Sequence, residues 1–184
     1  TIVPTLSIFL IRIETSFYHS YRKYYMQIQH KFSMSDILKS KRDMMNSLVL
    51  SVYRLLVYQG IITALCIAYS NNLIVWLKMD TNQLAVLRIC ILGAFAHAML
   101  MVLFIIVLYF DWKGLAMQLG VLFLVTNGSF TWVTLHMDFS AYGYGYFFSS
   151  LLTLSYGCIR FFERFNNLEY ITFMSQPLGN LKWD

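Results

Sequence analysis

Long apolar runs separated by short polar segments occupy most of this 184-residue chain. The four longest runs, each at least 22 residues, lie at 48–77, 84–110, 114–137 and 141–162. A helix of about 20 residues is enough to cross the hydrocarbon core of a membrane. A shorter apolar run, 1–11, has the character of the end of a further helix. The pattern predicts an all-α membrane protein, a polytopic bundle of four complete transmembrane helices plus the end of a fifth.

One long polar segment, residues 12–47, interrupts these runs and holds seven of the fourteen Lys and Arg residues. Its first part has aromatic residues at steps of four and three, which places them on one face of a helix, with basic residues beside that face. Such an amphipathic helix is suited to a membrane surface or to a partner protein. The candidate contact residues are Phe17, Tyr21, Tyr24, Arg22 and Lys23.

The polar segment is predicted to break at residues 33–35, where a serine can cap a new helix. This second helix begins near Asp36 and is expected to run unbroken into the membrane. Its apolar part is 48–77, and Asn71 and Asn72 indicate that its end is near. After the last apolar run, residues 163–184 form a mixed polar tail, in which Pro177 and Gly179 stop any helix.

The distribution of positive charge predicts how the helices are threaded. If 12–47 is cytoplasmic, the segments on that side hold eleven of the Lys and Arg residues, and the opposite loops hold only Lys78. Cytoplasmic loops of membrane proteins carry the excess of positive charge. We therefore expect 12–47 and the C-terminal tail, 163–184, to be cytoplasmic.

Composition excludes several other classes. Charged residues make up 12% of the chain, about half the share in an ordinary soluble domain. The net charge of +5 lies in loops beside apolar runs, which does not indicate a nucleic-acid groove. No catalytic motif, cofactor loop or metal-binding pattern is recognisable, so we predict neither an enzyme nor a cofactor. Because the chain opens at Thr1 within an apolar run, we expect the C-terminal part of a longer protein.

Polar residues inside the apolar runs are the candidates for a translocation path, because ionisable groups are costly in a membrane. Arg54 either lines a cavity or extends to lipid phosphate, and Arg88 is expected to extend to the membrane surface. His97, among small residues, either hydrogen-bonds across a helix pair or serves a substrate or a proton. Asn127 and Thr131 share a helical face with Thr134, and either contact sugar hydroxyls or join helices.

Several segments resemble one known family. They are R-x-E-T-x-F at 12–17, L-Y-F-D at 108–111, Y-G-Y-G at 142–145 and L-E-Y-I-T-F at 168–173. Their order and spacing are similar to the C-terminal part of the Pel exopolysaccharide transporters, the PelG family. That family is related to polysaccharide flippases of the MOP superfamily and is usually given about twelve spans. The resemblance implies that this chain carries the end of span eight and spans nine to twelve.

The resemblance also implies a function and partners. It implies export of the Pel polymer, an amino-sugar-rich biofilm polysaccharide, across the bacterial inner membrane. The implied partners are the polysaccharide, the lipid bilayer and other inner-membrane Pel components, including a glycosyltransferase and a cyclic-di-GMP receptor. Two alternatives remain open at this point: a flippase for another lipid-linked oligosaccharide, and a non-transporting scaffold for a polysaccharide synthase.

Overall fold

The computed structural model describes residues 18–29, 33–78, 80–137 and 141–168. Within these ranges the chain forms helices joined by short turns, with no strand. The helices are α2 (Tyr18–Gln29), α3 (Met34–Ala68), α4 (Ser70–Trp76), the 3-10 helix η2 (Thr81–Gln83), α5 (Leu84–Tyr109), α6 (Lys113–Leu135) and α7 (Tyr144–Asn166). The predicted all-α fold is therefore confirmed for the described part of the chain.

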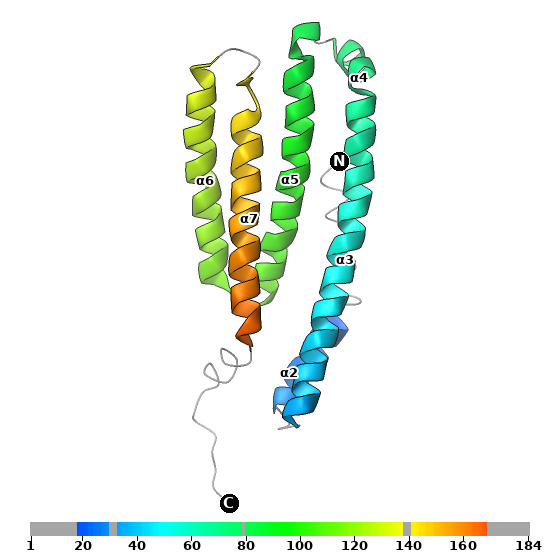
Figure 1. Cartoon of the computed structure of the whole chain (residues 1–184), viewed down its shortest axis with the longest axis vertical. Coiled ribbons are helices and arrows are strands. Elements are labelled where there is room, and N and C mark those ends of the chain that lie inside the picture. The colour runs from blue at the N-terminus through cyan, green and yellow to red at the C-terminus, as the bar shows by residue number, and fades with distance from the viewer. Residues whose placement is uncertain (1–17, 30–32, 79, 138–140, 169–184) are drawn as a thin grey trace, which may run out of the picture.

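The long helices lie side by side, with α7 packed against both α5 and α6 (Figure 1). The tyrosine ring of Tyr146 on α7 covers Gly93 on α5, and further along Gly157 on α7 meets Leu103 on α5. The contacts follow the same order on both helices, so α5 and α7 run parallel. α6 follows α5 and precedes α7 in the sequence, and it runs antiparallel to both. α3 lies against α5 on the other side of the bundle.

Among the described residues, three helical segments are long and apolar enough to cross a membrane: Ser35–Ala68, Leu84–Tyr109 and Lys113–Leu135. They correspond to the first three of the predicted spans, although the first begins well before residue 48. The fourth predicted span, 141–162, corresponds to α7, which has 23 residues but is not among these three because its sequence is less apolar. The structure thus supports a membrane protein with three such helices and does not establish the predicted count of four and the end of a fifth.

The helix whose apolar part was expected to be 48–77 is divided at Tyr69, shortly before Asn71 and Asn72, which were expected to lie near its end. The backbone there departs from helical geometry, with φ −89° and ψ 11°, and α4 starts at the next residue. Asn71 and Asn72 follow, and asparagine is a poor helix former because its side chain competes for backbone hydrogen bonds. Just after this point, Ser70, the first residue of α4, accepts a hydrogen bond from Arg88 of α5.

The core is richest in aromatic side chains at the end of the bundle where α5 turns into α6. Phe110 stacks on Trp112 with 5.0 Å between ring centroids, and both rings contact Phe161 of α7. Asp111 makes this tight turn with a positive φ of 56°. Trp112 is 8% exposed, so it is a core residue although it lies beside a tight turn.

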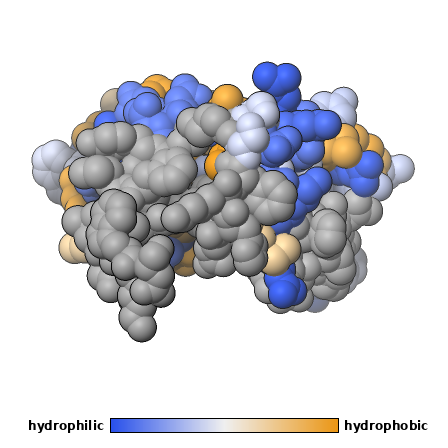
Figure 2. Space-filling model, turned by 90° about the horizontal axis from the view of Figure 1, so that it is seen from below, coloured by the Kyte–Doolittle hydropathy of each residue, from blue (hydrophilic) through white to orange (hydrophobic). Residues whose placement is uncertain are grey.

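Helix α2 packs against α3 at this same end. Tyr21 contacts the rings of Tyr109 and Phe110, at centroid distances of 5.1 and 5.8 Å. Seen from this end, hydrophilic residues cover much of the described surface (Figure 2). The exposed basic residues of α2, α3 and α6 near it are Arg22, Lys23, Lys39, Arg42 and Lys113.

Candidate functional site

Helix α7 presents a stripe of small and hydroxylated residues to its neighbours. Gly145, Ser149, Thr153 and Gly157 follow one another at steps of four and are all buried. Residues spaced by four lie on one helical face. A Cβ on Gly145 would lie 2.7 Å from the backbone nitrogen of Thr131, so α6 and α7 approach too closely there for any larger residue. The stripe therefore brings polar groups of α7 into the middle of the bundle.

Ser149 joins α7 to α6. Its hydroxyl lies 3.3 Å from the amide oxygen of Asn127 and 3.0 Å from the carbonyl oxygen of Tyr146, one turn back on α7. Ser150 donates to the same Tyr146 carbonyl at 2.8 Å. Both serines are fully buried. Asn127 thus accepts a cross-helix hydrogen bond through its oxygen, and its amide nitrogen is not engaged by Ser149.

His97 lies at the centre of α5, roughly 20 Å from either end of that helix at 1.5 Å per residue. Its ring contacts Phe123 of α6 and Tyr146 of α7, at centroid distances of 5.0 and 5.6 Å. Its Nδ1 atom is buried and has no hydrogen-bond partner among the described residues. The cross-helix hydrogen bond considered for this histidine is not formed through Nδ1, whereas the position between helices is as expected.

The hydroxyl of Thr153 is also buried without a partner among the described residues. It lies one turn beyond Ser149 and Ser150 on α7. We call His97, Asn127, Ser149, Ser150 and Thr153 the mid-bundle polar cluster. Its groups are neutral hydrogen-bond donors and acceptors, apart from the titratable imidazole. In the described ranges, no three His, Cys, Asp or Glu side chains are placed to hold a metal ion.

The other predicted path residues do not join this cluster. Thr131 is exposed, and its backbone packs on Gly145 while its carbonyl accepts a hydrogen bond from Thr134 at 3.0 Å. Arg54 is exposed on α3, away from the contact between α5, α6 and α7. Arg88, which was expected to extend to the membrane surface, is exposed and also donates to Ser70 at 2.9 Å.

The predicted contact residues of α2 divide into two groups. Tyr24 is fully buried and Tyr21 is half-buried against the core. Arg22 and Lys23 are exposed. Phe17 and the run 1–11 lie outside the described residues. The basic side of α2 is thus the part that remains accessible to a partner.

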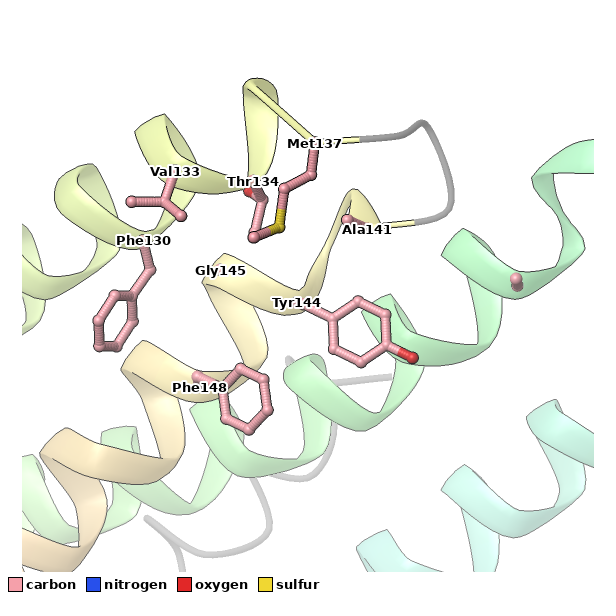
Figure 3. A pocket seen from close by; sticks show the side chains of 9 residues that line it. Phe130, Val133, Thr134, Met137, Ala141, Tyr144, Gly145 and Phe148 are labelled. Atoms are coloured by element: carbon pink, nitrogen blue, oxygen red, sulfur yellow. The ribbon is translucent and has the colours of Figure 1, made fainter.

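A pocket of about 560 Å³ lies between α6 and the start of α7, beside the contact of these two helices with α5 (Figure 3). Side chains of both helices line it, including Phe130 from α6 with Tyr144 and Phe148 from α7. The lining is mainly apolar, with Thr134 among the few polar residues. This pocket offers shape and aromatic surface, whereas the mid-bundle polar cluster offers hydrogen-bonding groups.

Sequence reasoning singled out His97 and Asn127 as candidates but did not single out Ser149, Ser150 or Thr153. Serine and threonine are common in membrane helices and carry no signal one at a time. The signal was the step of four that links Gly145, Ser149, Thr153 and Gly157, since small residues at this spacing let helices approach closely.

Comparison with known proteins identifies the family of this bundle. Residues 1–173 match the PelG family, which is described as "Putative exopolysaccharide Exporter (EPS-E)". No curated protein and no solved structure matches the chain at a significant level. The family match covers nearly the whole sequence and agrees with apolar helices that enclose hydrogen-bonding groups. The chain belongs to the PelG family of exopolysaccharide exporters, as the sequence resemblance indicated.

Proposed function

We propose that this protein takes part in exporting a Pel-type exopolysaccharide across the bacterial inner membrane. The observation that carries the proposal is the mid-bundle polar cluster. In it, Asn127 and Ser149 are joined across helices, and His97, whose ring contacts Phe123 and Tyr146, has an Nδ1 atom without a partner among the described residues. Buried polar groups in membrane helices usually face a protein interior or a wet path. The family match supplies the class of substrate.

The chemistry of the cluster suits a polysaccharide. Sugar hydroxyls both donate and accept hydrogen bonds, as do an amide, an imidazole and a hydroxyl. In the proposed mechanism, Asn127 and His97 contact hydroxyls of the passing chain when α6 and α7 shift against α5. Thr131 extends this path toward the end of α6. No bond is made or broken, so the protein acts as an exporter and not as an enzyme.

The proposal includes a threading in which α3, α5, α6 and α7 all cross the membrane. α7 has 23 residues and spans roughly 35 Å, which is sufficient for the hydrocarbon core. The end with α2 and the α5–α6 turn is cytoplasmic, as is the C-terminus, because positive charge gathers there.

Single substitutions in the full-length protein test the path. Asn127→Ala and His97→Ala are expected to lower secreted polymer, measured as hexosamine released by acid hydrolysis of culture supernatant, at unchanged protein abundance in the membrane. Gln118→Ala is the control, because Gln118 is an exposed polar residue of the same helix as Asn127. Normal export in both the Asn127 and the His97 variants would remove the cluster from the path.

A scaffold for a polysaccharide synthase is the second candidate function. Exposed basic residues at the proposed cytoplasmic end favour it, Arg22 and Lys23 among them. They would dock an acidic surface of the glycosyltransferase or of the cyclic-di-GMP receptor. Suppose that Arg22→Glu with Lys23→Glu abolishes co-purification of these proteins, while the Asn127 and His97 variants export normally. The protein is then a scaffold for the synthase and does not form the transport path.

The nature of the exported saccharide separates a polymer exporter from a flippase for lipid-linked oligosaccharides. If the protein is a polymer exporter, a strain without it should accumulate cytoplasmic polymer. If it is a flippase, that strain should accumulate an oligosaccharide that can be extracted into organic solvent.

A further inference from the structure

Helix α3 carries buried polar groups in the mainly apolar stretch 55–68 at its end. Gln59 is 1% exposed and Thr63 is 8% exposed, one turn apart on the face toward α5. Most other long side chains of this stretch, such as Tyr58 and Ile61, are exposed. The side chains of Gln59 and Thr63 therefore bring hydrogen-bonding groups to the inner face of a mostly apolar part of the helix.

Gln59 and Thr63 line a pocket of about 160 Å³ between α3, α4 and α5. Its other walls are Ile62, Cys66, Leu73, Leu87, Ile91 and Ala94. A water molecule takes about 30 Å³ of liquid volume and needs two to four polar partners. The pocket is therefore large enough for a few water molecules and has side chains that can hold them.

A polar clamp adjoins this pocket. Arg88 donates to the buried hydroxyl of Ser70 on α4, and Leu87 and Leu73 near these two residues are pocket walls. The clamp fixes α4 against α5 and so shapes the pocket at the end of the bundle near η2. In the proposed threading, this end faces away from the cytoplasm.

We infer that Gln59 and Thr63 form a hydrated saccharide subsite between α3 and α5, separate from the mid-bundle polar cluster. The amide of Gln59 and the hydroxyl of Thr63 bind one or two sugar hydroxyls, and the leucine and isoleucine walls cover the apolar face of the ring. This subsite rests on the proposed export function for its ligand class. Its hydration does not depend on that function.

Two native cysteines allow a matched test. Cys66 lines the Gln59 pocket, whereas Cys158 lines a larger pocket of about 370 Å³ between α3, α5 and α7. The second pocket has almost entirely apolar walls, such as Val52, Leu103 and Phe161. Both cysteines are half-buried free thiols on helices. They therefore differ chiefly in the polarity of the pocket that each one lines.

The experiment uses the full-length protein in lipid nanodiscs, with every cysteine except Cys66 or every cysteine except Cys158 replaced by serine. A permanently charged methanethiosulfonate reagent should modify Cys66 about tenfold faster than Cys158, because a charged reagent needs a wet route. N-ethylmaleimide, which is uncharged, corrects for geometric access. Equal corrected rates would overturn the hydrated pocket.

Substitution of Gln59 tests the residue that holds the water. Gln59→Leu, which is similar in size, should lower the charged-reagent rate at Cys66 about fivefold by removing the polar partner. Gln59→Asn keeps the amide and should retain most of the rate. Loss of the rate in the asparagine variant together with an unchanged rate in the leucine variant would contradict the assignment.

A soluble N-acetylhexosamine tetrasaccharide then probes the ligand class. At millimolar concentration it should slow modification of Cys66, whereas betaine at equal osmolarity should not. No protection at Cys66 would overturn the saccharide subsite and leave the proposed function intact, because that function is tested separately by export in the His97 and Asn127 variants. Protection with normal export in those variants would support the subsite while the mid-bundle path fails.

Discussion

Arg88 on α5 donates a hydrogen bond of 2.9 Å to Ser70, the first residue of α4, through its Nε atom. A second, longer contact of 3.5 Å joins the same guanidinium to the amide oxygen of Asn71. Ser70 is fully buried, so its hydroxyl depends on this partner. The charged group within an apolar helix thus has a local structural role: it holds α4 onto α5 just after the chain bends at Tyr69.

Removing the guanidinium should destabilise this contact. Arg88→Met keeps the apolar stem and is expected to cost about 1–3 kcal/mol, because the buried Ser70 hydroxyl loses its partner. The free energy of unfolding in mixed detergent micelles measures the loss. Lys78→Met is the control, because Lys78 is exposed and has no comparable contact with α4.

Removing the second partner should restore much of the stability. In the double variant Arg88→Met with Ser70→Ala, no hydroxyl is left unsatisfied, and replacing both members of a hydrogen bond can be nearly neutral. A double variant that is less stable than the sum of the two single changes would show that Arg88 acts through something other than Ser70.

Gly145 sets the distance between α6 and α7. In Gly145→Ala, the new Cβ would lie 2.7 Å from the nitrogen of Thr131, and the clash is with backbone, which cannot rotate away. Overpacking of this kind costs about 1–3 kcal/mol. Gly128→Ala on α6 is the matched control, because nothing lies within 4 Å of its Cβ. There alanine should be neutral or stabilising by up to about 1 kcal/mol. Thermal unfolding in detergent compares the two, and equal midpoints would exclude tight packing at Gly145.

The long helices were predictable because apolar length is a direct property of the sequence. The runs 84–110 and 114–137 correspond closely to α5 and α6. The aromatic face of 12–29 was also visible, since Tyr21 and Tyr24 are placed together by helical spacing alone. The residues that this face contacts could not be predicted, because Tyr109 and Phe110 lie nearly 90 residues away in the chain.

The site was less predictable than the fold. His97 stood out because an ionisable residue in an apolar run is unusual. Ser149 and Thr153 did not, because their importance comes from α7 lying parallel to α5 and against α6, which no local pattern specifies. The division of the helix at Tyr69 was not predicted either. The bond between Arg88 and Ser70, which holds α4 onto α5 just beyond it, joins residues that are 18 apart in the sequence.

Thr153 offers a test that separates structure from function. Its hydroxyl is buried without a partner among the described residues, so Thr153→Val should leave the free energy of unfolding unchanged or raise it by about 1 kcal/mol. Valine keeps the shape of the side chain but removes the hydrogen-bonding group. If the hydroxyl serves the passing saccharide, secreted hexosamine should fall although the protein is at least as stable. Unchanged export would make Thr153 a packing residue only.

The threading of the bundle can be tested with two exposed positions at its opposite ends. Lys39 lies near the start of α3, and Asn82 lies in η2 between α4 and α5. With every native cysteine replaced by serine, Asn82→Cys should react with a membrane-impermeant maleimide added to intact cells whose outer membrane has been permeabilised. Lys39→Cys should react only after the inner membrane is also opened. The physical reason is the excess of Lys and Arg at the α2 end, which favours retention in the cytoplasm. The reverse labelling would invert the proposed threading, and with it the placement of Arg22 and Lys23 on the side where a synthase partner could reach them.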